Sequence, residues 1–132
     1  MEAVNTVVDW AMVVIVWLVQ LVIYPGFRRI SKERFASWHG RYLKIAGYVI
    51  APLMIVQLAF AIEDFVSTGE WMSRESLYAS LVLLTWIVTF RIFVPIHGSL
   101  QDRGPDGRIV GQLVTANWIR TFLWSVILFV SP

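Results

Sequence analysis

The stretches LVLLTWIVTFRIFVPIHG (residues 81–98) and LVTANWIRTFLWSVILFV (residues 113–130) decide the fold of this chain. Each approaches the length of about 20 mostly apolar residues that a helix needs to cross a bilayer. Each also contains one permanently charged side chain, Arg91 in the first stretch and Arg120 in the second. An arginine in the middle of a bilayer is costly, so it faces the interior of a helix bundle, reaches the headgroups or binds an anion.

The composition of the whole chain agrees with a membrane protein. Of its 132 residues, 58% are hydrophobic and only 15% are charged. Together with the two stretches above, two earlier apolar segments predict four helices, at about residues 4–24, 42–62, 77–100 and 109–130. We therefore predict one integral membrane domain over residues 1–132, with an all-α, four-helix transmembrane fold. The absence of cysteine excludes disulfides, iron–sulfur clusters and thiolate metal sites.

The charges of the connections predict how the bundle lies in the membrane. The connection between the first two segments is strongly basic, with Arg28, Arg29, Lys32, Arg34, Arg41 and Lys44 against Glu33. The next connection is acidic, with Glu63, Asp64, Glu70 and Glu75 against Arg74. The positive-inside rule then places the basic connection in the cytoplasm and both termini outside, in a bacterial inner membrane. Because the connections are short, we predict an up-down-up-down bundle.

Several polar side chains fall toward the predicted cytoplasmic side of the spans. They are Gln20, Tyr24, His39, Tyr42, Arg91, His97, Asn117 and Arg120. On the fourth segment, polar and aromatic residues at 117, 120, 121 and 124 follow i, i+3, i+4 and i+7 spacing, which makes one helix face. Lipid offers such a face no hydrogen-bond partner, so we expect it to point into the bundle.

The two arginines differ in how they are expected to lean. Side chains on a helix lean toward its N-terminus. Arg91 therefore leans away from its nearer surface and has the stronger case for an internal partner, whereas Arg120 leans toward that surface and could reach the headgroups. No acidic residue is expected at this depth. The guanidinium groups then require other acceptors, such as carbonyls, a lipid phosphate or an anionic ligand.

The two histidines, His39 and His97, are expected at matched depth near the cytoplasmic ends of the second and third segments. This placement suits the two axial ligands of a haem, with haem b as the candidate cofactor. Proton transfer by His97 is the alternative role. A non-haem metal site is not expected, because no carboxylate or cysteine lies nearby.

The segments VPIHGSLQDRG (residues 94–104) and LVTANWIRTFLW (residues 113–124) resemble a family of small, poorly characterised bacterial four-helix membrane proteins. YPGF (residues 24–27) and FASWHGRY (residues 35–42) fit the same pattern. The second half is more distantly similar to the anthrone-oxygenase-like membrane proteins, which are linked to cofactor-independent oxidation of polycyclic aromatics. His97 stands where that distant family is expected to have asparagine. The resemblance implies a functional cluster of His97, Asn117, Trp118 and Arg120.

Three functions remain open. The first is a pocket near the cytoplasmic side that binds a small anionic or quinone-like amphiphile, with redox chemistry as an option; its ligand-binding residues are Arg91, Asn117, Trp118, Arg120, Tyr24 and His39, and His97 transfers the proton. The second is a haem protein that uses His39 and His97. The third is a non-catalytic accessory subunit, a homo-oligomer or a member of a larger membrane complex. Membrane lipid is the expected partner in each case, and nucleic acid is not.

Overall fold

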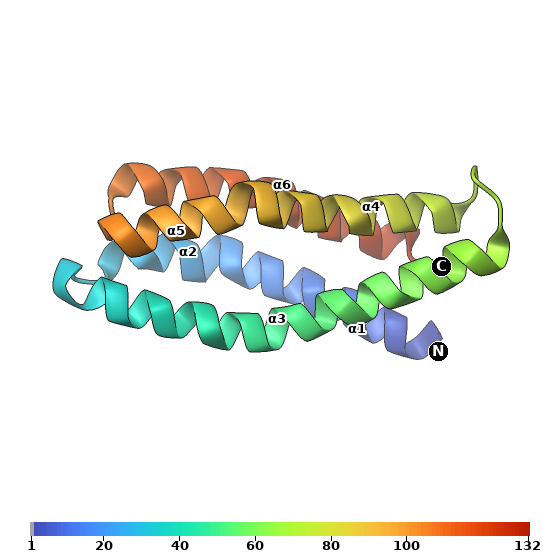
Figure 1. Cartoon of the computed structure of the whole chain (residues 1–132), viewed down its shortest axis with the longest axis horizontal. Helices are drawn as coiled ribbons and strands as arrows, with labels where there is room; N and C mark the ends of the chain where they lie inside the picture. The colour runs from blue at the N-terminus through green and yellow to red at the C-terminus, as the bar shows by residue number, and fades with distance from the viewer. Residues whose placement is uncertain (1) are drawn as a thin grey trace.

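The computed structural model describes residues 2–132 as four long helical rods (Figure 1). The first rod comprises α1 (Glu2–Leu18), a π-helix η1 (Val19–Ile23), α2 (Tyr24–Gly26) and a 3₁₀ turn η2 (Phe27–Arg29). The second is α3 (Lys32–Thr68), the third comprises α4 (Arg74–Val88), a π-helix η3 (Thr89–Phe93) and α5 (Val94–Arg103), and the fourth is α6 (Gly107–Val130). All four rods are long and apolar enough to cross a membrane. The predicted all-α, four-helix fold is confirmed.

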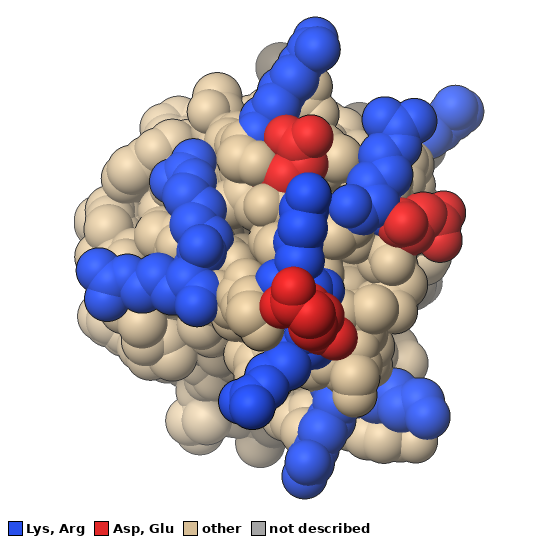
Figure 2. Space-filling model, turned by 90° about the vertical axis from the view of Figure 1, so that its left-hand side faces the viewer, with Lys and Arg blue, Asp and Glu red and all other residues tan. Residues whose placement is uncertain are grey.

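The rods alternate in direction, as the short connections predict (Figure 1). α1 packs against α3 and α6, and α4 packs against the same two helices, so consecutive rods are neighbours and the last closes against the first. Both ends of the chain lie at the end of the bundle opposite η2 (Figure 1). Figure 2 views the η2 end, where the side chains of Lys and Arg predominate over those of Asp and Glu. The segregation of charge along the sequence is thus also a segregation in space.

The second rod is longer than the sequence indicates. α3 begins at Lys32, and the expected start was near residue 42. The basic segment before Tyr42 is part of an amphipathic helix: Phe35 and His39, four residues apart, are fully buried. At the other end, Gly69 stops α3 in a left-handed conformation, with φ of 67°, and its N–H donates to the carbonyl of Phe65.

The two π-helices occupy equivalent places, each ending two residues before a proline. The N–H of Tyr24 donates to the carbonyl of Val19, and the N–H of Val94 donates to the carbonyl of Thr89, so each bond spans five residues. Pro25 follows the first and Pro95 the second. A proline has no N–H to offer the preceding turn and its ring crowds the carbonyl four residues back, and the wider turn accommodates it.

The π-turn η3 determines which face of the third rod carries His97. On an unbroken α-helix His97, twelve residues after the buried Thr85, would be rotated by about 120° from it, at about 100° per residue. The extra residue in the π-turn reduces this rotation by about 100°, so His97 lies within about 20° of the buried face. Phe93 and Leu100 are brought inward in the same way and are almost fully buried.

Candidate functional site

A chain of hydrogen bonds links three of the four rods near the basic end. The Tyr24 hydroxyl lies 3.1 Å from Nε2 of His97, and Nδ1 of His97 lies 3.0 Å from Nε2 of His39. Nδ1 of His39 lies 2.7 Å from Oε1 of Gln101, whose Nε2 donates to the carbonyl of Ala36 at 2.9 Å. The structure thus brings together Tyr24, His39 and His97, which the sequence predicts only to lie toward one side of the membrane.

The direction of every bond in this chain follows from its last member. The amide nitrogen of Gln101 faces a carbonyl, so its oxygen faces His39 and can only accept. His39 with neutral imidazole then carries its proton on Nδ1 and accepts at Nε2, so His97 donates from Nδ1. Nε2 of His97 is left to accept from the hydroxyl of Tyr24. The chain is thus polarised from Tyr24 toward Gln101.

Arg120 on α6 completes the cluster. Its side chain is 6% exposed, and its guanidinium carbon lies 4.4 Å from the ring centre of Phe93 and 5.2 Å from that of Trp124. Its charge also acts on the neighbouring Tyr24 hydroxyl. Nε of Arg120 is buried without a hydrogen-bond partner. Aromatic faces attract the cation, but they do not accept its N–H groups as a carboxylate would.

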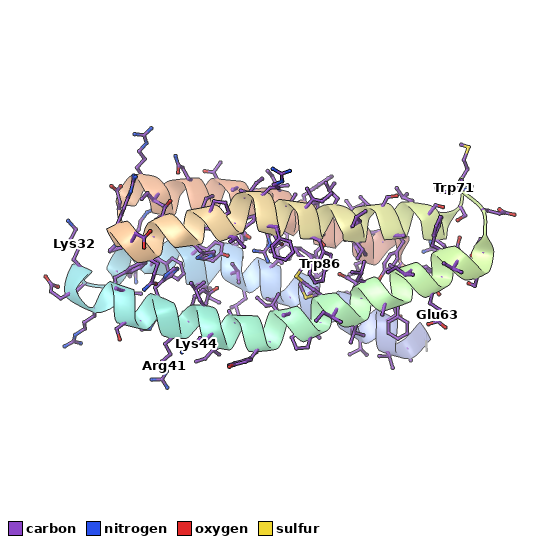
Figure 3. The ribbon with its side chains drawn as sticks, viewed as in Figure 1. Lys32, Arg41, Lys44, Glu63, Trp71 and Trp86 are labelled. Carbon is purple, nitrogen blue, oxygen red and sulfur yellow. The ribbon has the colours of Figure 1, made fainter. Side chains whose placement is uncertain are left out.

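These polar groups open into a cavity of about 540 Å³ between α3 and the third rod. Its lining combines the polar side chains of Tyr24, Tyr42, His97, Gln101 and Arg120 with apolar residues of α3, α4 and η3, and contains no Asp or Glu. Trp86 also lines it, and its indole N–H is buried without a partner. Figure 3 shows Trp86 in the space between α3 and α4, midway along the bundle. The size and the few convergent polar groups are those of a small-molecule site.

Arg91 is not part of this cluster, and the expectation that it points inward is wrong. Its side chain is exposed on the outside of the bundle, and it does not line the cavity. Arg91 follows the buried Thr85 by six residues, so it lies at least about 120° from it around the helix, with or without the rotation of the π-turn, and faces outward. The direction in which a side chain leans along the helix says nothing about this rotation.

The predicted face of α6 is confirmed, with one correction. Asn117, Arg120, Thr121 and Trp124 are all buried. Trp118 was expected in the functional cluster, but it is 48% exposed and its ring packs edge-on against Trp17 on the outside. Its position one residue after Asn117 turns it about 100° away from the inward face.

Asn117 belongs to a hydrogen-bonded pair beside the cavity and does not line it. Its Nδ2 donates to Oε1 of Gln20 at 2.9 Å, and Nε2 of Gln20 donates to the carbonyl of Val114. Oδ1 of Asn117 is buried without a partner. An unpartnered acceptor and the unpartnered Nε donor of Arg120 thus lie three residues apart on one face of α6.

The two histidines do not fit the axial positions of one haem. A metal–imidazole bond is about 2.0 Å long, so nitrogens on opposite sides of an iron lie about 4 Å apart with the porphyrin between them. Here the rings of His39 and His97 contact each other directly, 3.0 Å between nitrogens, and their other nitrogens are also hydrogen-bonded. Over residues 2–132, no group of three or more His, Asp or Glu side chains is placed to hold a metal ion.

Two residues of the site, Gln101 and Trp86, are not among those predicted from the sequence. Gln101 follows His97 by four residues, the helical spacing that would have placed it on the same face. Trp86 stands in an apolar run and carries no polar signal of its own. No protein-family model matches the chain, and no curated protein or solved structure matches it. The candidate site therefore rests on its own geometry.

Proposed function

We propose that the cavity between α3 and the third rod binds a small amphiphile with an acidic head group, of the carboxylic acid, phenol or quinol kind. The observation that carries the proposal is Arg120, a buried guanidinium that lines an apolar cavity with Nε unpartnered and no carboxylate in the lining. A buried cation of this kind is stabilised by a bound anion. The apolar remainder of the cavity suits a ring or an acyl chain.

The polarity of the hydrogen-bond chain assigns it the role of proton acceptor. Because Tyr24 donates to His97 and His97 to His39, a proton arriving from the cavity can pass along the existing bonds in that direction. It would rest as an imidazolium on His97 or His39, and Oε1 of Gln101 is already placed to accept from Nδ1 of His39. Arg120 stabilises the oxyanion left on the ligand. His97 is the base of this proposal, and Tyr24 is the group next to the ligand.

The test compares the two embedded arginines. The detergent-purified protein is extracted with organic solvent, and the extract is analysed by mass spectrometry for an enriched acidic amphiphile. We expect Arg120→Gln to lose the amphiphile and Arg91→Gln, a matched change on the outside of the bundle, to retain it. An amphiphile lost equally in both variants would mean that the arginines act on lipid in general, and retention in both would refute an anion site at Arg120.

A second measurement tests the base. A naphthol that fluoresces differently as acid and anion is titrated into the purified protein, emptied of extractable amphiphile. We expect the bound probe to be more ionised than the free probe at the same pH. His97→Phe should retain binding and lose this ionisation, whereas Arg120→Gln should weaken binding. A probe that binds to the wild type without ionising would rule out proton acceptance.

The orientation of the bundle belongs to the same proposal. The basic connection lies at the end of the bundle nearest the His39–His97 pair, and the acidic connection lies at the other. We propose, by the positive-inside rule, that the site lies on the cytoplasmic side of a bacterial inner membrane, with both termini outside. Cysteines introduced at positions 71 and 32 and labelled from outside intact cells test this orientation. We expect labelling at position 71 and protection at position 32, and the opposite result would reverse the orientation.

A further inference from the structure

A second buried polar cluster lies at the acidic end of the bundle, about 22 Å along the first rod from Tyr24 at about 1.5 Å per residue. Its centre is Asp9, whose side chain has no exposed surface. Oδ1 of Asp9 accepts from Nε2 of Gln57 at 2.6 Å and lies 2.9 Å from the hydroxyl of Tyr78. Oε1 of Gln57 accepts from the indole N–H of Trp124 at 3.2 Å. The second and third rods thus contact the carboxyl group of Asp9 directly, and the fourth is linked to it through Gln57.

With the Asn5 amide oriented as it is and Asp9 ionised, the hydroxyl of Tyr78 faces more acceptors than it has protons. The hydroxyl oxygen of Tyr78 lies 2.9 Å from Oδ1 of Asp9, 3.2 Å from Oδ2 and 2.9 Å from Oδ1 of Asn5. A phenol has one proton, and all three of these oxygens are acceptors. A proton on the carboxyl group resolves the shortage, because the acid then donates to the oxygen of Tyr78 while Tyr78 donates to Asn5.

The charges around Asp9 favour the same state. None of the described side chains around Asp9 is a cation: Gln57, Tyr78 and Ser131 interact with it directly, and Asn5 and Trp124 join the cluster through Tyr78 and Gln57. Arg74, a cation at the same end of the bundle, instead donates to the carbonyls of Val130 and Phe129. A carboxylate buried without a cation is far more costly than its neutral acid.

An acidic hollow leads toward the cluster from the end of the bundle. It has a volume of about 740 Å³ and is lined by Glu63, Asp64 and Glu75, among others. Asn5 also lines it, and Asn5 accepts the hydrogen bond of Tyr78 that continues to Asp9. Figure 3 shows Glu63 at the end of the bundle that holds this hollow, near the chain's N-terminus. Surface carboxylates collect protons and cations from water and concentrate them at such an entrance.

We propose that Asp9 is a proton-binding site inside the membrane span, held as the carboxylic acid, and that the acidic hollow is its entrance through Asn5 and Tyr78. The site is separate from the cavity near Arg120 and does not depend on the function proposed for it. Carboxyl groups that bind and release protons within a helix bundle are typical of proton-coupled membrane proteins.

The test is infrared spectroscopy of the full-length protein in lipid vesicles at neutral pH. We expect a C=O band of a protonated carboxylic acid that is absent from Asp9→Asn and present in Glu63→Gln, the control at the hollow. A spectrum without the band, or a band that survives Asp9→Asn, would overturn the proposal. A missing band would mean instead that Asp9 is ionised and that the Asn5 amide is turned to donate to Tyr78.

Two further measurements complete the test. In heavy water the band should shift as the acid proton exchanges, and Asn5→Leu should slow that shift; an unchanged rate would reject the hollow as the entrance. Asp9→Asn should also fold and melt close to the wild type, because a neutral amide offers both a donor and an acceptor, as the acid does. Loss of folding in Asp9→Asn with Asp9→Glu intact would point to an obligatory carboxylate and overturn the assignment.

Discussion

The hydrogen bond between His39 and His97 can be isolated by a double-mutant cycle. His97→Phe strands two groups, Nε2 of His39 and the hydroxyl of Tyr24. His39→Phe strands Nδ1 of His97 and Oε1 of Gln101. The double variant strands only the hydroxyl and the amide oxygen, because the two histidine nitrogens that faced each other are both gone. The double variant should therefore lose less stability than the sum of the single variants.

The size of this difference follows from the surroundings of the bond. Stranding a buried polar group costs about 1–3 kcal/mol in soluble proteins. In membrane bundles the coupling energies of interhelical hydrogen bonds average about 0.6 kcal/mol and reach about 1.7, because the unfolded chain in lipid also finds partners. His39 is fully buried and each of its nitrogens has one partner. We therefore expect the upper end of that range, a coupling energy of about 1–1.7 kcal/mol.

The assay is reversible unfolding of the four proteins in mixed detergent micelles, followed by circular dichroism. The control cycle combines His97→Phe with Arg91→Leu, whose side chain points outward six residues earlier on the same rod. Distant sites add within about 0.5 kcal/mol, so the control should show no more than that. Additive effects of the His39 and His97 changes, within the same 0.5 kcal/mol, would refute the chain of hydrogen bonds as drawn.

Three changes elsewhere test the geometry with thermal unfolding. A Cβ added at Gly40 would meet the amide of Gln101 at 3.6 Å, an ordinary contact, so Gly40→Ala should be nearly neutral, whereas Gly40→Leu should displace Gln101 and lower the melting temperature; equal effects would contradict this. Ser73→Ala should cost about 1 kcal/mol, because the Ser73 side chain caps α4 by accepting a backbone N–H; no loss would mean that the cap is unnecessary. Gly69→Ala should cost about 1 kcal/mol more than Gly47→Ala, since Gly69 has positive φ and Gly47 does not. The reverse order would contradict the left-handed conformation of Gly69 at the end of α3.

The spans and their order could be predicted because hydropathy over about 20 residues decides them. The start of α3 could not be predicted in the same way. Basic residues before Tyr42 signal a membrane boundary, and a helix that continues beyond the bilayer carries the same signal. The buried pair Phe35 and His39, at helical spacing, was the evidence that the sequence did offer.

The site was only partly predictable for a different reason. The polar face of α6 repeats at helical spacing, so its burial followed from the pattern alone. The third rod contains a π-turn, and after such a turn residue spacing no longer gives the face. The orientation of His97 therefore could not be predicted from the sequence, and neither could the hydrogen bonds that depend on it. The partnership of His39 with Gln101 needs the relative rotation of two rods, which no single-helix pattern contains.

Among the residues that the structure describes, Asp9 is the one buried Asp or Glu and Arg120 the one buried Lys or Arg. Arg120 and Asp9 would neutralise each other if they were adjacent, but Trp124 and Gln57 stand between them: the ring of Trp124 faces the guanidinium, and the amide of Gln57 joins the indole to Asp9. With Asp9 as the neutral acid, the interior of the bundle carries the single positive charge of Arg120. A buried charge without a partner is unstable in a hydrocarbon environment. An anion bound in the cavity, as we propose, would balance this charge, so on that proposal the purified protein should retain an acidic amphiphile and Arg120→Gln should release it.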